Sequence, residues 1–345
     1  MDTRLMTETA RAMVAPGKGL LAADESAGTC KKRFDAVGVE STEDNRRAYR
    51  EMLFTTPGIE QHVSGVILFD ETLRQSTKDG INFGRYLESR GIIPGIKVDA
   101  GAHDMALHPG EKVTEGLDGL PKRMAEYFGM GARFAKWRAV ITIGDSIPTM
   151  ACIEANAHAL ARYSAICQEA SIVPIVEPEV LLDGSHTAAR SEGVHQDTLE
   201  TLFHALERHG VLLEHVILKA SMVVSGNKNP QQASVAEVAE RTLRVLKRTV
   251  PAALPGVVFL SGGQTDENAT AHLDAMNRRR EAHQDPAPWP LTFSYSRALQ
   301  QVALNTWRGS AANVQAAQAA FAHRARMNGL AARGQWTREL EKKAA

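Results

Sequence analysis

The chain alternates between short apolar runs and longer stretches in which apolar residues recur with helical spacing. Helical periodicity is clearest at 149–170, 195–209, 234–249 and 266–280. Strands that alternate with helices indicate parallel strands joined by crossover helices. Eight runs rich in Val, Ile, Leu, Phe and Gly have strand character, and they lie at 19–24, 63–69, 94–99, 133–141, 172–177, 215–219, 256–263 and 291–296.

Eight strand-helix units within 345 residues favour a single (β/α)8 barrel of the α/β class. A doubly wound open sheet is the alternative, but no Gly-x-Gly-x-x-Gly follows the first strand and no change of composition marks a domain boundary. We therefore expect one barrel domain over residues 1–345 with extra N- and C-terminal helices. Alanine-rich helices are expected at 297–305 and 310–327, and residues 310–345 form a helical C-terminal extension.

The overall charge excludes several classes of partner. With 40 basic and 40 acidic residues the formal net charge is zero, so no global field would draw the chain to nucleic acid or to an anionic membrane. The basic run 278–280 has no interleaved aromatic residues and is expected to be a solvated loop or helix end. No apolar run approaches the ~18 residues of a membrane span.

Cysteine usage and the N-terminal segment predict a cytoplasmic protein. Cys30, Cys152 and Cys167 are odd in number and lack metal or redox spacing, which argues against a disulfide framework and against structural zinc. Residues 1–17 include Asp2 and Glu8 and lack a long apolar stretch, so a signal peptide is not expected.

Titratable residues gather where the predicted strands end. Because side chains in a strand alternate between faces, Lys136 and Arg138 share one face, which in a barrel is the interior. The same alternation points Lys97 and Asp99, Ala22 and Asp24, and Ile217 and Lys219 inward. Glu177 and Glu179 straddle Pro178, whose missing N–H predicts that the strand stops pairing there. All these groups should meet at the carboxyl ends of the strands, where barrel enzymes carry their sites.

Acids and lysines interleaved on one rim favour a catalytic cluster over a structural ion-pair network. An amine attacks a ketone only when it is deprotonated, and the ordinary pKa of lysine is about 10.4, so the nucleophile needs desolvation or a nearby cation. Lys219 is the candidate nucleophile and Lys136 the candidate cation. Glu177 is the candidate acid and base for loss of water from the carbinolamine, and Asp24 the candidate base for carbon-carbon cleavage.

Two regions have the features of phosphate sites. Ser261-Gly262-Gly263 follows the seventh strand and Ser296-Arg297 follows the eighth, and barrels frequently bind phosphate in these two loops. A second set near the first and third strand ends comprises Ser26, Thr29, Lys32, Arg33 and Lys97, of which Lys32 and Arg33 are equally compatible with a solvated helix.

With these residues in view, the chain resembles the class I fructose-1,6-bisphosphate aldolases over nearly its whole length. The resemblance implies a (β/α)8 barrel, usually tetrameric and independent of metal or other cofactor, that cleaves fructose 1,6-bisphosphate to dihydroxyacetone phosphate and glyceraldehyde 3-phosphate in glycolysis and gluconeogenesis. The matching segments are VAPGKGLLAADES (14–26), GVILFDETL (65–73), GIKVDAG (95–101), FAKWR (134–138), ARYSAICQ (161–168), IVPIVEPE (172–179), KRTVP (247–251), FLSGGQ (259–264) and FSYSRALQ (293–300).

The resemblance also assigns roles to individual positions. Lys219 matches the Schiff-base lysine, Glu177 the acid/base of carbinolamine dehydration with Glu179 beside it, and Asp24 the acid of carbon-carbon cleavage. Lys136 and Arg138 match the charged pair of the fourth strand. Ser261, Gly262 and Arg297 match the subsite for the C1 phosphate, and Ser26, Thr29 and Lys97 match the region that receives the C6 phosphate.

The chain departs from the family pattern at three places. Where the family commonly reads Lys-Pro-Asn-Met, this chain has Lys219-Ala220-Ser221-Met222. Before the phosphate-binding arginine glycine is usual, whereas here Ser296 restricts the backbone and offers a hydroxyl to a phosphate. Vertebrate-type members end in a tyrosine that helps to exchange a proton on the enamine. This sequence does not end in tyrosine, so the late proton transfer is expected to lack an assigned residue here.

Two other interpretations stay open from the residues alone. A different Schiff-base barrel, such as a transaldolase or an aldolase that prefers a monophosphate, would use the same lysine. A weakened aldolase-like scaffold protein is the alternative from a different functional class. A metal-dependent aldolase is disfavoured because no His-x-x-x-His spacing stands out among the 12 histidines.

Overall fold

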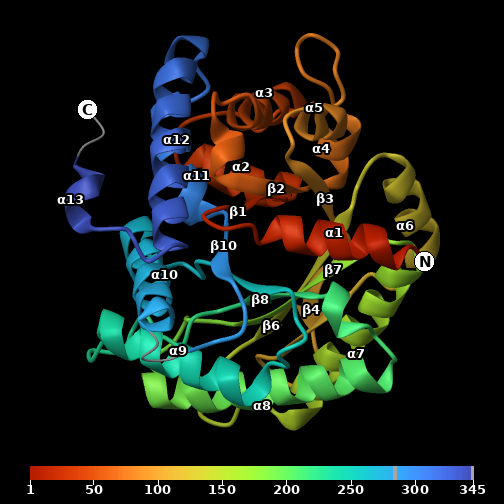
Figure 1. Cartoon of the computed structure of the whole chain (residues 1–345), viewed down its shortest axis with the longest axis vertical. Coiled ribbons are helices and arrows are strands. Elements are labelled where there is room, and N and C mark those ends of the chain that lie inside the picture. Colours follow the sequence, from red (N-terminus) through yellow and green to blue (C-terminus); the bar gives the residue numbers. More distant parts are fainter. Residues whose placement is uncertain (283–285, 343–345) are drawn as a thin grey trace.

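The computed structural model describes residues 1–282 and 286–342 and contains a closed barrel of eight parallel strands (Figure 1). The strands follow one another around the barrel in the order β1-β10-β9-β8-β7-β6-β3-β2, and β2 pairs with β1 to close it. The predicted (β/α)8 barrel is therefore confirmed. The strands are β1 (Gly19–Ala23), β2 (Val63–Leu68), β3 (Ile93–Lys97), β6 (Phe134–Ile141), β7 (Val173–Val180), β8 (Ile217–Ala220), β9 (Gly256–Phe259) and β10 (Leu291–Tyr295).

Helices cover the outside of the barrel and continue beyond its last strand. Six helices were predicted and all six are present, although α8 begins seven residues before its predicted start at 195. The α-helices are α1 (Thr3–Met13), α2 (Ala27–Asp35), α3 (Glu43–Phe54), α4 (Asp70–Arg74), α5 (Phe83–Ser89), α6 (Leu120–Gly129), α7 (Met150–Glu169), α8 (Ala188–Arg208), α9 (Val235–Thr249), α10 (Asp266–Glu281), α11 (Arg297–Trp307), α12 (Val314–Ala331) and α13 (Arg338–Glu341). Short 3-10 turns lie at Ile59–Gln61, Leu213–His215 and Ala311–Asn313.

Apolar side chains fill the barrel interior, and α1 closes its amino-terminal end. Met6, Ala10 and Met13 of α1 are fully buried against the first residues of several strands, among them Val173 and Ile217. Ser64 of β2 donates a hydrogen bond to the Met13 carbonyl at 2.6 Å, which fixes the helix end to the sheet. Since this end is packed shut, the carboxyl ends of the strands are left to form the open mouth.

Glycine makes room for a bulky aromatic side chain inside the barrel. A Cβ built on Gly95 of β3 would lie 2.2 Å from the Phe134 ring of the neighbouring strand β6. Phe134 is fully buried. The first inward residue of β6 thus packs the floor of the interior, and the next two inward residues on that strand, Lys136 and Arg138, are carried toward the mouth.

The predicted end of β7 at residue 177 is wrong. The strand continues through Pro178 to Val180 and pairs with β6 along its whole length. Backbone N–H groups of Val173 and Leu181 donate toward β6, so by alternation the nitrogen of Pro178 faces β8, where pairing ends at Val176 and Leu218. Proline therefore sits on the side of the strand that has no further ladder to complete.

A small hairpin between β3 and β6 was not predicted. Strands β4 (Gly101–Asp104) and β5 (Lys112–Glu115) pair antiparallel. Each strand has only four residues, most of them polar, so neither strand contains an apolar run that could be detected in the sequence. The hairpin is tied to the barrel by Thr114, whose hydroxyl donates to the Arg138 carbonyl at 2.8 Å.

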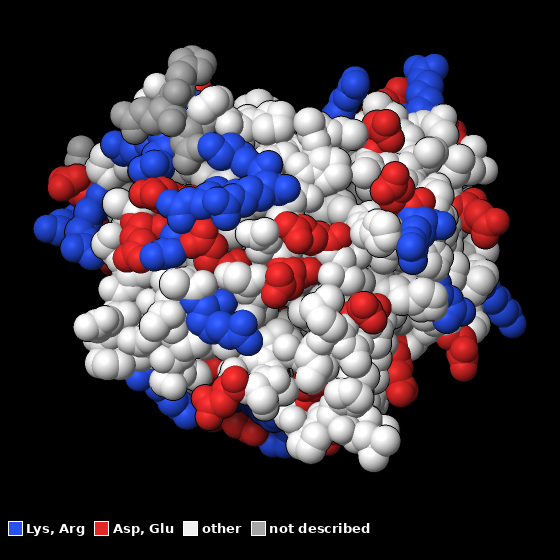
Figure 2. Space-filling model, turned by 90° about the horizontal axis from the view of Figure 1, so that it is seen from below, with Lys and Arg blue, Asp and Glu red and all other residues white. Residues whose placement is uncertain are grey.

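Charges of both signs are mixed on the outer surface. Figure 2 shows the face on which α8 and α9 lie, and on it Lys and Arg side chains adjoin Asp and Glu side chains. Glu192 of α8, for example, pairs with Arg241 and Arg244 of α9. Within residues 1–282 and 286–342, no helix is long and apolar enough to cross a membrane.

Candidate active site

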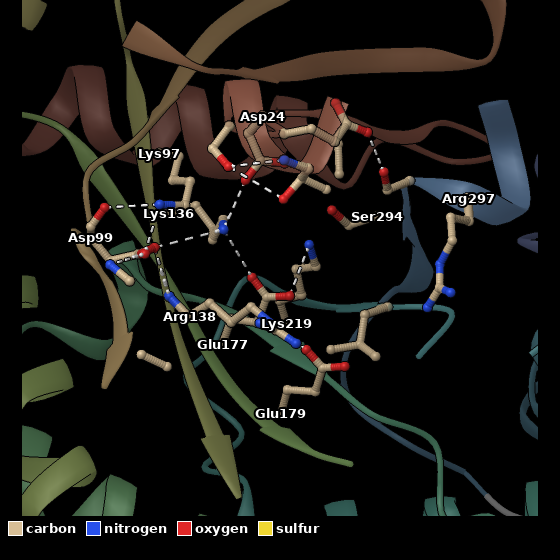
Figure 3. A pocket seen from close by; sticks show the side chains of 18 of the residues that line it. Asp24, Lys97, Asp99, Lys136, Arg138, Glu177, Glu179, Lys219, Ser294 and Arg297 are labelled. Carbon is tan, nitrogen blue, oxygen red and sulfur yellow. Dashed lines mark hydrogen bonds and ion pairs between the residues drawn. The ribbon is translucent and has the colours of Figure 1, made fainter. Parts of the chain in front are cut away.

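A cavity of about 590 Å³ opens at the carboxyl ends of the barrel strands. It brings together residues that are separated by more than 270 positions in the chain, from Asp24 to Arg297 (Figure 3). Lys32 and Arg33 line it, whereas Gly263 does not. It is also lined by thirteen other residues singled out from the sequence, namely Asp24, Ser26, Thr29, Lys97, Lys136, Arg138, Glu177, Glu179, Lys219, Ser261, Gly262, Ser296 and Arg297.

Lys219 lies near the end of β8 with its side chain only 5% exposed. Its Nζ is 3.1 Å from Oε1 of Glu177 on the adjacent strand β7. The next residue, Ala220, is still in the strand, and its carbonyl accepts from the Leu260 N–H at 3.0 Å. A buried amine that touches one carboxylate oxygen has a nearby group to give it a proton or take one away.

Lys136 lies between three carboxylates. Its Nζ is 2.8 Å from Asp24, 3.5 Å from Glu177 and 3.8 Å from Asp99. Burial would lower the pKa of Lys136, but the charges of Asp24, Glu177 and Asp99 outweigh burial and raise it. Lys136 is therefore a permanent cation whose charge is balanced locally by these three acids.

The pKa of Asp24 is shifted the opposite way. Burial alone would raise the pKa of this carboxyl, but the charges of Lys136, Lys219 and Lys97 hold it well below its usual range. Asp24 consequently stays ionised across the whole physiological range.

Two further ion pairs border this centre. Arg138 pairs through Nε with Glu179 on β7, and burial, which would lower the pKa of Arg138, is outweighed by the Glu179 charge. Lys97 donates to both the Asp99 carboxylate at 2.7 Å and the Asp99 carbonyl at 2.8 Å. Both pairs keep charged side chains oriented at the rim without a ligand.

The loop after β9 contains two consecutive glycines with left-handed backbone. Gly262 and Gly263 have φ of 58° and 97°, a region that glycine adopts without strain. A Cβ on Gly263 would lie 3.3 Å from Nη2 of Arg297. Within the described part of the chain, the Arg297 side chain has no hydrogen-bond or ion-pair partner.

The second polar region begins at α2. The Ser26 hydroxyl caps this helix by accepting from the Thr29 N–H at 3.4 Å, and the two hydroxyls lie 3.3 Å apart. In Figure 3, Lys97 and Arg297 lie on opposite sides of the cavity with Lys219 between them. The Lys219 amine thus lies between two regions that contain cationic side chains.

Several cavity residues were missed by reasoning from the sequence. Asp99 was expected to point inward but was not assigned to the site, although it contacts both Lys97 and Lys136. Ser294 lines the cavity two positions before Ser296, and its buried hydroxyl has no partner among the described residues. Strand alternation was the signal that could have identified both residues.

Glu25 is the largest omission. Its side chain is 5% exposed, and one of its oxygens accepts from Arg50 at 2.7 Å while the other accepts from Arg33 and from the Ser296 hydroxyl, the latter at 2.6 Å. Burial would raise the pKa of Glu25, but Arg50 and Arg33 lower it. The partners come from α3, α2 and the start of α11, so no local pattern could reveal this cluster.

A metal site requires several ligating side chains grouped together. Over residues 1–282 and 286–342, no three or more His, Cys, Asp or Glu side chains form a group that could hold a metal ion. The acids of the cavity are instead paired with lysines and arginines, as described above.

Comparison with known proteins agrees with this geometry. A sequence model of the glycolytic class-I fructose-bisphosphate aldolases matches residues 5–345. The probable fructose-bisphosphate aldolase class 1 of Xylella fastidiosa (strain 9a5c) is 58% identical over 337 residues, which is 97% of this chain and 99% of the relative. Fructose-bisphosphate aldolase 5, cytosolic, of Arabidopsis thaliana is 51% identical over 332 residues, which is 96% of this chain and 91% of that protein.

A solved structure has the same fold. A crystal structure of fructose-bisphosphate aldolase from Plasmodium falciparum superimposes with a TM-score of 0.94 at 47% identity, covering 97% of this chain and 95% of the other. Sequence and structure therefore match over nearly the full length, and this chain belongs to the class-I fructose-bisphosphate aldolases, a family of aldehyde-lyases.

Proposed function

We propose that this protein cleaves fructose 1,6-bisphosphate reversibly to dihydroxyacetone phosphate and glyceraldehyde 3-phosphate through a Schiff base on Lys219, without a metal or other cofactor. Family membership supports the reaction. The single observation that carries the mechanism is the 3.1 Å contact between the Lys219 amine and the Glu177 carboxylate at the centre of a cavity with cationic groups on both sides.

Lys219 and Glu177 carry out imine formation in this mechanism. The neutral amine attacks the C2 ketone, and the carbinolamine must lose its hydroxyl as water for the iminium to form. Glu177 lies close enough to donate that proton and to accept one from the amine nitrogen. Its other oxygen lies 3.5 Å from Nζ of Lys136, so the carboxylate lies between the two lysines.

Asp24 is the proposed base for carbon-carbon cleavage. It takes the proton of the C4 hydroxyl as the C3–C4 bond breaks, and the bonding electrons pass into the iminium to give an enamine. Asp24 is available for this step because the neighbouring lysines keep it ionised. Lys136, which contacts Asp24 at 2.8 Å, becomes free to stabilise the oxygen at C4 as Asp24 gains the proton.

The two cationic regions suit a substrate with a phosphate at each end. Each phosphate monoester carries about −1.5 to −2 charges at neutral pH. Seven Lys and Arg side chains and five carboxylates line the cavity, so its lining is net positive. We assign the C1 phosphate to Ser261, Gly262 and Arg297, with Ser296 beside them. We assign the C6 phosphate to Ser26, Thr29 and Lys97.

Borohydride trapping tests the proposal. Reduction in the presence of fructose 1,6-bisphosphate or dihydroxyacetone phosphate is expected to inactivate the enzyme irreversibly and to add the reduced triose phosphate or sugar phosphate to Lys219, located by peptide mapping. EDTA should leave turnover intact. Labelling at Lys136 instead, or complete inactivation by EDTA, would contradict the assignment.

The same enzyme preparation separates the alternatives. A higher kcat/KM for fructose 1-phosphate than for the bisphosphate would favour an aldolase that prefers a monophosphate. Trapping without turnover of either sugar would favour a weakened, scaffold-like protein.

We further propose a cytoplasmic homotetramer that acts in glycolysis and gluconeogenesis. The proposal is supported by family membership and by relatives whose names describe them as cytosolic. Light scattering of the purified protein tests the assembly, and a monomeric mass at micromolar concentration would rule it out.

A further inference from the structure

Ser296 occupies a position where the family usually has glycine, and its hydroxyl has an unexpected use. The residue precedes α11, yet its side chain does not cap that helix. Instead it donates to Oε1 of Glu25 at 2.6 Å and accepts from Nη1 of Arg33 at 3.0 Å. Its only proton is therefore directed at Glu25 rather than at the cavity.

Glu25 is also held by residues other than Ser296 and Arg33. Its second oxygen accepts from Nη2 of Arg50, a residue only 2% exposed, and the Nε of Arg50 donates to the Ala23 carbonyl at the end of β1 at 2.9 Å. Gln300 of α11 adds a hydrogen bond to Oε1 at 3.1 Å. The carboxylate is thus held by groups from three helices, one of which, Arg50, is itself bonded to the end of β1. It can move little without breaking several charge-assisted bonds.

Arg33 is the exposed end of this network. Its side chain lines the cavity and is 19% exposed. One nitrogen, Nη1, makes the bonds to both Glu25 and Ser296. Among the described residues, nothing accepts from its Nε or Nη2, so these nitrogens remain free to donate to a ligand in the cavity that Arg33 lines.

Resting on the proposed function, we propose that Ser296 and Glu25 are positioning residues that hold Arg33 for the C6 phosphate, so that Ser296 sets the preference for the bisphosphate over the 1-phosphate. Arg33 lies on α2, the helix that begins at the proposed C6 region of Ser26 and Thr29. Ser296 lies instead between β10 and α11, directly before Arg297. One hydroxyl therefore connects the loops at the two phosphate ends.

Kinetics of three variants test this. Ser296→Ala removes the hydroxyl and keeps the Cβ, whereas Ser296→Gly removes both. Loss of one hydrogen bond to a guanidinium is expected to raise the KM for fructose 1,6-bisphosphate by about 3- to 10-fold and to lower kcat by less than about twofold. The KM for fructose 1-phosphate should rise by a much smaller factor. Ser296→Thr, which restores a hydroxyl, should recover most of the loss.

A double-mutant comparison links the effect to Arg33. In an Arg33→Ala background, adding Ser296→Ala should change the KM for the bisphosphate by less than about twofold, because the group that it positions is gone. Ser234→Ala, an exposed serine that caps α9, is the matched control for loss of a hydroxyl elsewhere and should behave like the unaltered protein.

Binding without catalysis keeps the inference separate from the proposed function. A hexitol 1,6-bisphosphate has no ketone and cannot form an imine, so its affinity measured by calorimetry does not depend on turnover. Weaker binding of the bisphosphate, but not of the 1-phosphate hexitol, in Ser296→Ala supports the inference even if no sugar is cleaved. Equal losses for both ligands, a lower KM in Ser296→Ala, or a defect in Ser296→Gly alone would overturn it.

Discussion

Lys136 shows how individual residues define the chemistry of this site. A lysine that is 3% exposed is tolerated because three carboxylates surround it, and each of those acids also faces the cavity. The cluster therefore stabilises its own charges while it leaves Asp24 ionised. Replacement of one member changes both a reactive group and the balance around it.

Asp24→Asn separates imine formation from cleavage. The amide has the same shape but cannot take the C4 hydroxyl proton, so kcat should fall by about 10²- to 10⁴-fold. Borohydride labelling of Lys219 should persist, because Glu177 and the amine are intact. Turnover and labelling are measured on the same sample.

Asp35→Asn is the control for this substitution, since Asp35 forms only an exposed ion pair with Lys31. It should retain full turnover. A kcat within about threefold of the original in Asp24→Asn would remove Asp24 from the cleavage step.

Residues near the site differed in how far they could be predicted. Lys136 and Arg138 were placed on one face by strand alternation, which is a property of the local backbone. Glu25 was missed because its partners, Arg50 and Ser296, lie 25 and 271 positions away. No pattern within one strand or helix records such contacts.

At the scale of elements, α10 supports the loop that follows β9. His272 of α10 is 7% exposed, and its Nδ1 lies 2.6 Å from the Gln264 side-chain oxygen, directly after the two glycines of the loop. Because an amide oxygen accepts, the histidine is the donor. Burial lowers the pKa of His272 to about 4.

The lowered pKa predicts a dependence of stability on pH. As the pH falls from 7 toward 4, the unfolded chain binds a proton near the ordinary histidine pKa of about 6.5, whereas the folded protein does not. Folding stability is therefore lost over this window. His272→Asn removes this titrating group. Between pH 7 and pH 5, the free energy of unfolding of the variant should therefore fall by about 1–2 kcal/mol less than that of the original protein.

Urea denaturation of both proteins at the two pH values measures this difference. The contribution of His195, whose pKa burial also lowers to about 4, is common to both and cancels. Parallel losses in the two proteins would show that His272 does not titrate as proposed.

Elements were predictable wherever they have their own apolar pattern. The barrel strands and the long helices from α7 to α12 have it. The β4–β5 hairpin does not, because its residues are mostly polar, and it is held by tertiary contacts such as Glu111 with Thr149 at 2.7 Å. The early start of α8 depends on the Thr187 side chain, which caps the helix before its first buried apolar positions become regular.

For the whole molecule, α1 divides the barrel into a packed end and an open end. Met6 is fully buried in the interior cluster at the amino-terminal end. Met6→Ala should therefore lower the free energy of unfolding by about 2–5 kcal/mol through the cavity it leaves. Since the substrate cavity lies at the other end of the strands, KM and kcat should stay within about twofold.

Chemical denaturation and steady-state kinetics together check this prediction. Met150→Ala makes the same substitution at a site that is 50% exposed, where little burial is lost, and should leave stability nearly unchanged. A large rise in KM in Met6→Ala would mean that packing at the closed end is transmitted to the site.

The sequence by itself determined the eight strand-helix units, the inward direction of Lys136 and Lys219, and the glycine-rich loop. These follow from periodicity and from backbone preferences, which act over a few residues. Only the tertiary structure decided that three carboxylates balance the charge of Lys136 and that Glu25 accepts hydrogen bonds from several distant residues. The hydrogen bond between the Ser296 hydroxyl and Arg33 was likewise decided only there. These features depend on distances between groups far apart in the chain, which barrel closure alone brings within reach of a hydrogen bond.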